Sequence, residues 1–164
     1  MKKTTAAVAV ASIALACSTI ISATNAPFQA SAHEGHEHFS AGEPGDPKKP
    51  SRIVKITMLE DGKKMLFAPA IVAVKLGEQI RFILYNEGTE KHEFMLATVT
   101  ENRKHAALMK KYPDMEHDDP NAISLPPLNS GELVWQFTKR GEFEYACLIP
   151  GHLEAGMHGR VVVK

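Results

Sequence analysis

The feature that most limits the fold is a series of short apolar segments, divided by turn residues, that begins near residue 51. Val54, Ile56 and Met58 would share one face of a first strand, because alternate side chains of a strand point to opposite faces. Asp61-Gly62 then marks a turn. A second strand is predicted at 65–74, and Pro69 within it makes it a bent or edge strand. Further strands are predicted at 79–85, 93–99, 132–138, 142–147 and 160–163. Short strands separated by turn signals predict an all-β sandwich or barrel.

One segment departs from this pattern. Residues 101–112 mix charged side chains with Ala, Leu and Met, which favours a short helix, and Pro113 would end it. Residues 114–121 and Pro126-Pro127 are expected to form a long loop. The helix is therefore interpreted as an insertion in a β domain.

The first 32 residues have the layout of a secretory signal peptide. A basic start, Met1-Lys2-Lys3, precedes an uncharged apolar run from Ala6 to Ala23, and Ala30-Ser31-Ala32 offers a cleavage site after Ala32. A retained membrane anchor is the alternative, because the run has about the 18 residues that can span a bilayer. A lipid anchor at Cys17 is a second, less favoured alternative, because Ala14-Leu15-Ala16 matches a lipoprotein signal poorly.

The predicted mature chain has two parts. Residues 33–50 are rich in Gly, Pro, His and charge and are expected to form a flexible tail, because they cannot bury enough apolar surface to offset ordering. Residues 51–164 form the predicted β domain. The chain has 19 Lys and Arg against 19 Asp and Glu, so no basic excess points to nucleic acid. No second long apolar run follows, so no membrane insertion is expected after cleavage.

The cysteine count singles out one residue. Of the two cysteines, Cys17 lies in the predicted signal, so Cys147 has no partner for a disulfide in an exported protein. A free thiol is a liability in an oxidising compartment, and either a bound metal or burial would protect it.

The sequence CLIPGHLEAGMHG places Cys147, His152 and Met157 five positions apart. Blue-copper sites use one Cys and two His in a plane with a weak axial Met, because soft sulfur ligands suit Cu(I) and imidazole suits both oxidation states. Pro150-Gly151 would turn the chain so that His152 faces back, and His92 is the best candidate for the second imidazole. The alternative is that Cys147 is an inert core thiol and Met157 an ordinary core residue.

The run Tyr145-x-Cys147-x-x-Pro150-Gly151-His152, with Met157 after it, resembles the cupredoxins, the small type 1 copper proteins that include plastocyanin and azurin. The spacing is similar to that of rusticyanin and auracyanin. The resemblance covers residues 53–164 and implies an eight-stranded Greek-key sandwich. It implies one copper ion, with these ligands: His92, Cys147, His152 and Met157. The His-rich leader and residues 115–121 look like those of bacterial periplasmic copper-tolerance cupredoxins.

Residue 93 departs from the family pattern. Many cupredoxins have Asn or Ser after the first ligand His, where it ties the two ligand loops together, and this chain has Glu93. The departure bears on the colour and potential of the site, because groups around the ligands tune a metal centre. A Glu oxygen could also compete as a ligand.

Two further groups of side chains suggest additional copper. Short His-rich tracts bind metal, and His33, His36 and His38 form one, with a free amino group at His33 after cleavage. A solvated tail is the alternative. His105 and Met109 share a helix face, and Met115 and His117 follow in the loop. The alternative there is a helix that packs through Met109 with His105 in solvent.

The sequence thus predicts a periplasmic, monomeric copper protein that cycles between Cu(I) and Cu(II) for electron transfer. Its predicted physiological role is copper tolerance. A redox partner would dock near His152, where an apolar rim of residues 148–150 and 153 is expected. The alternative is a copper-sequestering module that relies on the tail and the His/Met loop. An enzyme is not expected, because four protein ligands leave no position for a substrate.

Overall fold

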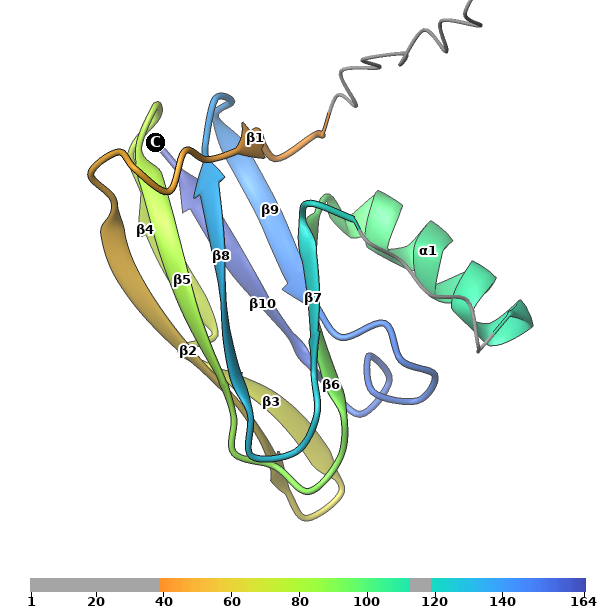
Figure 1. Ribbon diagram of the computed structural model, residues 1–164. Helices are drawn as coiled ribbons and strands as arrows, with labels where there is room; N and C mark the ends of the chain where they lie inside the picture. Colours follow the sequence, from red (N-terminus) through yellow and green to blue (C-terminus); the bar gives the residue numbers. More distant parts are fainter. Residues whose placement is uncertain (1–38, 113–118) are drawn as a thin grey trace, which may run out of the picture. The chain divides into compact units, whose positions relative to one another are not determined.

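The computed structural model describes residues 39–112 and 119–164. Two five-stranded sheets face each other in this part of the chain, and one helix lies beside them (Figure 1). The first sheet has the order β1-β8-β5-β2-β3 and the second β4-β10-β9-β6-β7. The elements are β1 Glu43–Pro44, β2 Arg52–Asp61, β3 Lys64–Ala68, β4 Ile71–Val74, β5 Gln79–Asn86, β6 His92–Ala97, α1 Val99–Lys111, β7 Ala122–Leu125, β8 Ser130–Gln136, β9 Gly141–Ala146 and β10 His158–Val163. In the described residues, no helix has the length and apolar character needed to cross a membrane.

The core lies between the two sheets and confirms the predicted alternation. In β2 the side chains of Val54, Ile56 and Met58 are buried, while Ile53, just before them and on the opposite face, is 61% exposed. Aromatic rings fill the centre, with Phe94 stacked on Tyr145 at 5.3 Å between ring centroids. Residues of both sheets therefore contribute to one apolar layer, as the all-β sandwich prediction requires.

Pro69 divides the predicted strand of residues 65–74. β3 lies at the edge of the first sheet and β4 at the edge of the second, so the chain changes sheets at this proline. The prediction of a bent or edge strand is confirmed, because proline cannot donate a ladder hydrogen bond and is confined to such positions. The Tyr145 hydroxyl donates a hydrogen bond of 2.6 Å to the Pro69 carbonyl oxygen and ties the two sheets together here.

The described residues contain more strands than the eight that the resemblance implies. The break at Pro69 makes two strands of one, and the two-residue β1 adds another. The sequence also missed β7, because its four residues were assigned to the long loop before Pro126. β7 pairs with β6, with Leu125 opposite His92. It therefore covers the edge of the strand that carries the first candidate ligand.

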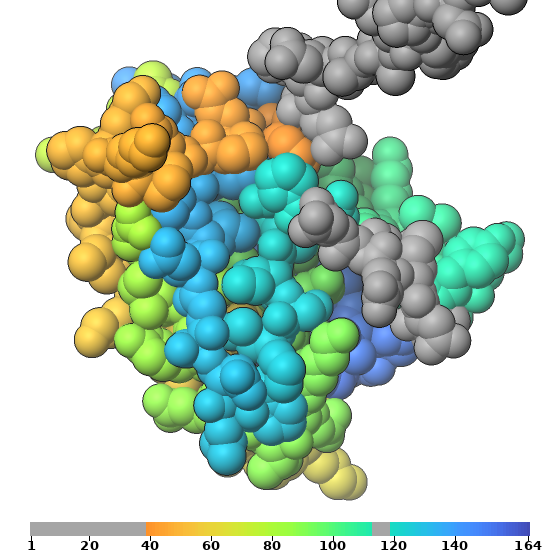
Figure 2. Space-filling view, in the orientation of Figure 1, coloured from red at the N-terminus to blue at the C-terminus, as the bar shows by residue number. Residues whose placement is uncertain are grey.

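The predicted tail needs a correction over residues 39–50. Phe39 packs edge-on against Trp135 with 5.3 Å between ring centroids, and Ala41 is completely buried. β1 pairs with the end of β8, and these residues lie against the surface of the sandwich (Figure 2). One aromatic ring and a short pairing are enough to attach a segment whose composition is typical of a free tail. Residues 33–38 lie outside the described part.

Helix α1 follows β6, where the helical insertion was predicted. The Thr98 side chain accepts a hydrogen bond from the Glu101 backbone N–H, and the Glu101 side chain accepts one from the Thr98 backbone, which forms a capping box. Met109 is buried with Met95, Ala146 and Leu148 in a small second core cluster. The helix therefore packs on the side of the second sheet that carries β6 and β9 (Figure 1).

Candidate metal centre

The loop between β9 and β10 is folded by its own backbone. Cys147 follows β9 directly, and its N–H donates a 3.1 Å hydrogen bond to the Met157 carbonyl oxygen, while the Met157 N–H donates one of 3.0 Å to the His152 carbonyl oxygen. Gly151 and Gly156 adopt positive φ angles of 95° and 100°, a conformation that other residues rarely adopt. These bonds and turns bring residues five positions apart to one end of the sandwich.

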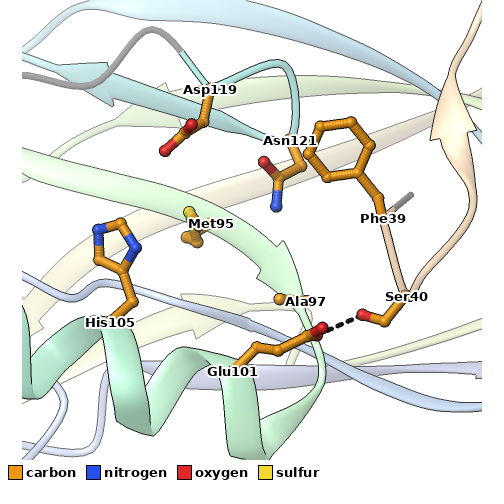
Figure 3. A pocket seen from close by; sticks show the side chains of 8 residues that line it. All are labelled: Phe39, Ser40, Met95, Ala97, Glu101, His105, Asp119 and Asn121. Atoms are coloured by element: carbon orange, nitrogen blue, oxygen red, sulfur yellow. Dashed lines mark hydrogen bonds between the residues drawn. The ribbon is translucent and has the colours of Figure 1, made fainter. Parts of the chain in front are cut away.

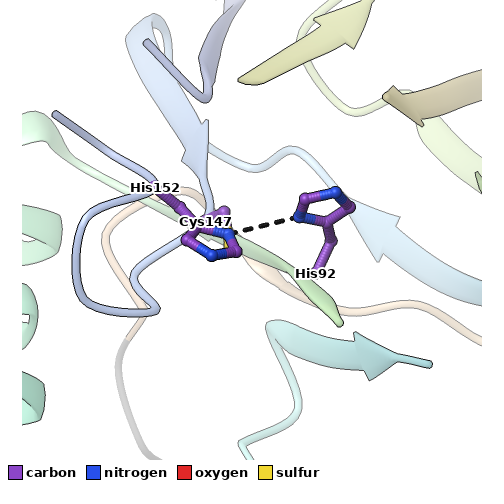
Figure 4. Close-up of side chains that lie close together, drawn as sticks. All are labelled: His92, Cys147 and His152. Atoms are coloured by element: carbon purple, nitrogen blue, oxygen red, sulfur yellow. Dashed lines mark hydrogen bonds between the residues drawn. The ribbon is translucent and has the colours of Figure 1, made fainter. Parts of the chain in front are cut away.

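His92 reaches the same place from β6. Because β6 and β9 pair antiparallel with Met95 opposite Ala146, the start of β6 lies beside the residues that follow β9. The Nδ1 atoms of His92 and His152 are 3.2 Å apart, and Cys147 Sγ is 3.3 Å from His152 Nδ1. Figure 4 shows the three side chains pointing toward one another. In the described residues no other three His, Cys, Asp or Glu side chains come together in this way.

The donor set fits a soft metal ion. Protein sites hold imidazole nitrogen at about 2.0–2.1 Å and thiolate sulfur at about 2.3 Å from zinc, so ligand atoms sharing such an ion lie about 3.3–3.8 Å apart. One potential ligand atom from each of His92, Cys147 and His152 lies within 4.8 Å of those of the other two. Two imidazoles and one thiol are also the in-plane ligand types of blue-copper sites.

Burial sets the protonation of this cluster in the absence of metal. It raises the pKa of the Cys147 thiol to about 12, although the Glu93 N–H donates to the sulfur at 3.3 Å. Burial also lowers the pKa of His152, and the nearby His92 acts in the same direction. The apolar surroundings thus favour a neutral thiol and a neutral imidazole, and a bound cation is what would stabilise a thiolate here.

Each imidazole meets a carboxylate on its outer side. His92 Nε2 lies 2.8 Å from Glu60 Oε1, and His152 Nε2 lies 3.4 Å from Glu90 Oε2. Hydrogen bonds, chiefly from the Thr89 backbone N–H, lower the pKa of Glu60 to about 2, so this carboxylate accepts the His92 Nε2–H. The sequence did not reveal Glu60, because it lies 32 positions before His92 and no local motif connects them.

Glu93 ties the two ligand segments together in this structure. The residue is 5% exposed, and its Oε2 accepts a hydrogen bond of 3.3 Å from the Leu148 backbone N–H. With the bond from its own N–H to Cys147 Sγ, it joins the start of β6 to the residues after β9 at two points. The carboxylate thus makes the kind of loop connection that Asn or Ser makes in many cupredoxins.

Met157 and its neighbour His158 face opposite ways. Met157 is completely buried in the main core together with Cys147, while the His158 side chain is 51% exposed and lies 3.7 Å from Glu144. The interpretation that His158 points away from the centre is confirmed. Burial next to the cluster suits Met157 equally as a core residue and as a weak axial ligand.

The structure places only two of the second-copper candidates. Met109 packs in the second core cluster, as the alternative reading of the helix expected. His105 lines a cavity of about 230 Å³ with Met95, Asp119 and Asn121, near the hydrogen bond from Ser40 to Glu101 (Figure 3). His33, His36, His38, Met115 and His117 lie outside the described residues. A second copper site therefore stays a prediction.

Comparison with known proteins agrees with this geometry. Residues 54–164 match the family described as copper binding proteins, plastocyanin/azurin family. The chain belongs to this family. Its resident cofactor is copper, which the donor set of the candidate centre fits.

Relatives of this family member include copper-resistance proteins. The chain is 44% identical over 164 residues to the copper-resistant cuproprotein CopI of Rubrivivax gelatinosus, covering 92% of this chain and 95% of that one. It is 33% identical to the CopI of Pseudomonas aeruginosa, covering 84% and 90%. The resemblance to bacterial copper-tolerance cupredoxins is thereby confirmed.

Solved structures share the fold. Auracyanin B aligns with a TM-score of 0.61 at 21% identity, covering 76% of this chain and 96% of that one. A multicopper oxidase from Campylobacter jejuni aligns with a TM-score of 0.53 at 18% identity, covering 74% of this chain but 31% of that one. At these identities the likeness concerns the fold, and it confirms the predicted cupredoxin sandwich.

Proposed function

We propose that the protein is a periplasmic electron carrier that acts as a monomer in copper tolerance, exported by its first 32 residues. Its copper ligands in this proposal are His92, Cys147, His152 and Met157. The observation that carries it is the convergence of two imidazole Nδ1 atoms and one thiol sulfur within 4.8 Å of one another. The names of the copper-resistance relatives support the physiological task.

The chain's own residues give each part of the site a role. When bound, copper supplies one-electron chemistry by cycling between Cu(I) and Cu(II). Cys147 would provide a strong, soft thiolate ligand, His92 and His152 would provide imidazole ligands, and Met157 would add a weak thioether ligand. Four protein ligands close the site to a substrate, which favours a carrier over an enzyme.

His152 is the proposed exit for the electron. It is 6% exposed, and its Nε2 faces the exposed Glu90 at the surface. Pro150 and Gly151 beside it are exposed, and Ile149 is half-buried. A redox partner that docks here would come close to a ligand ring without opening the copper site.

The test is the visible absorption and EPR spectrum of the protein purified from the periplasm of a bacterial host. With Cu(II), we expect an intense thiolate-to-copper band, one copper per chain, and loss of the band in Cys147→Ala. Mass spectrometry of the same sample should give a chain that begins at His33. A wild-type spectrum without this band would overturn the ligand proposal.

The same samples test the alternative that the protein sequesters copper at additional sites. If Cys147→Ala keeps a second EPR signal and the wild type holds more than one copper, the His-rich tail or the His/Met loop binds metal as well. A chain that lacks residues 33–38 then separates these two sources, because it retains His105 and Met109.

A further inference from the structure

The carboxylate of Glu60 lies directly behind one proposed copper ligand. Its Oε1 is 2.8 Å from His92 Nε2, the ring nitrogen on the far side from the cluster. The His92 side chain is completely buried and the Glu60 side chain is 19% exposed, so water has little access to this contact. A carboxylate oxygen can only accept, which places the proton of a neutral His92 ring on Nε2 and leaves Nδ1 free to face the metal.

The surroundings of Glu60 hold its carboxylate in place. The Thr89 N–H donates to it at 2.8 Å and the Thr89 hydroxyl at 3.1 Å, and the Glu90 N–H donates at 3.2 Å. A Cβ on Gly88 would lie 2.2 Å from Glu60 Oε1, so any larger residue at this position would displace the carboxylate. Glu60 stands near the end of β2, and the loop after β5 supplies every one of these donors, so the contact is built from two distant segments.

We propose that Glu60 is a positioning residue of the copper site, which fixes the ring and tautomer of His92 and favours Cu(II) over Cu(I). The inference rests on His92 being a copper ligand, as proposed above. Histidine ligands commonly donate their second N–H to a carboxylate or carbonyl, which orients the ring and makes it a better electron donor. The negative charge also stabilises the more highly charged Cu(II) ion more than Cu(I). Both effects lower the reduction potential of the site.

The second carboxylate acts more weakly. Glu90 Oε2 is 3.4 Å from His152 Nε2, and the Glu90 side chain is 56% exposed. Solvent screens such a contact, and the longer distance weakens the hydrogen bond. The structure thus provides an internal comparison, with one half-buried and one exposed carboxylate, each behind an imidazole of the same cluster.

The first experiment needs no copper and no variant. Nitrogen-15 NMR of the copper-free wild type reports which ring nitrogen of His92 carries the proton. We expect the Nε2–H tautomer, with that proton protected from exchange. The Nδ1–H tautomer at His92 would overturn the proposal.

The second experiment compares Glu60→Gln with Glu90→Gln. Glu132→Gln is the control, because the exposed Glu132 of β8 pairs with Arg81 of β5 at 2.7 Å and not with a histidine. Loss of such an outer partner typically weakens metal binding about 10–100-fold. For Glu60→Gln we expect Cu(II) affinity to fall at least about tenfold relative to Cu(I), which raises the reduction potential by about 59 mV per tenfold. Glu90→Gln should give a smaller rise and Glu132→Gln none.

The outcomes separate this inference from the ligand proposal. A wild type without a thiolate-to-copper band contradicts the ligand set, while the tautomer measurement still decides the Glu60–His92 contact. A normal band with an unchanged potential in Glu60→Gln contradicts the tuning role alone. A lower unfolding midpoint with unchanged potential would make Glu60 a purely structural residue, which also overturns the proposal.

Discussion

At the scale of single residues, a buried glutamate lies beside the candidate metal centre. Glu93 occupies the position after the first proposed ligand, where the resemblance led us to expect Asn or Ser, and it still joins the two ligand segments through the Leu148 N–H. Burying a carboxylate is costly unless hydrogen bonds compensate, so its retention here is consistent with a structural task.

We expect Glu93→Ala to lower the free energy of unfolding of the copper-free protein by about 1–3 kcal/mol, because the Leu148 N–H loses its acceptor in a buried place. Glu93→Gln keeps an oxygen acceptor and should cost less. Urea unfolding measures both, with the exposed Glu142→Ala as control. Equal losses in Glu93→Ala and Glu142→Ala would show that the connection between the loops contributes nothing.

At the scale of elements, helix α1 is attached by its first turn and by two buried side chains, Asn102, which donates a hydrogen bond of 3.0 Å to Glu144 Oε2, and Met109. The Thr98 capping box begins the helix, and Ser40 also donates a hydrogen bond to Glu101, the second member of that box. Met109 packs on β6 and β9 near the other end. The helix therefore depends on contacts at both ends, because its exposed face is charged.

Thr98→Ala should lower stability by about 0.5–2 kcal/mol, since the Glu101 N–H loses its cap. Thr100→Ala, in the same turn but exposed, is the matched control and should change stability much less. Thermal unfolding followed by circular dichroism measures the difference. The thiolate-to-copper band should stay unchanged in both variants, and its loss in Thr98→Ala would mean that α1 supports the metal centre directly.

At the scale of the whole molecule, residues 39–50 cover one end of the sandwich. These residues bring Phe39 and Ala41 onto the chain's only tryptophan, whose Nε1–H donates a 3.2 Å hydrogen bond to the Ala41 carbonyl oxygen. The ordered sandwich therefore begins before residue 51, and the candidate metal centre lies at the start of β6 and just after β9, away from this cover (Figure 1).

A chain that lacks residues 1–50 should be less stable than one that lacks residues 1–38 by at least about 2 kcal/mol, because it loses large buried apolar contacts. The Trp135 emission should also move to longer wavelength in the shorter chain, because the ring loses its cover. If both truncated chains unfold at the same urea concentration, residues 39–50 do not belong to the folded domain.

The amino-acid sequence by itself determined the features that depend on neighbouring residues. The alternation at residues 53–58, the turn at Asp61-Gly62 and the helix after β6 follow local rules, and the structure confirms them. The grouping of Cys147 and His152 was equally local, because the loop of residues 147–157 closes on itself. His92 came from the family resemblance, and the pairing of β6 with β9 brings it to that loop.

The tertiary structure alone decided the contacts between distant segments. Glu60 meets His92 only because the end of β2 and the loop after β5 lie together, and β7 exists only because β6 offers it an edge. Residues 39–50 are likewise held by distant partners, including Trp135 and Val134 of β8. Such contacts leave no periodic pattern, since each depends on the packing of two sheets that a single segment cannot specify.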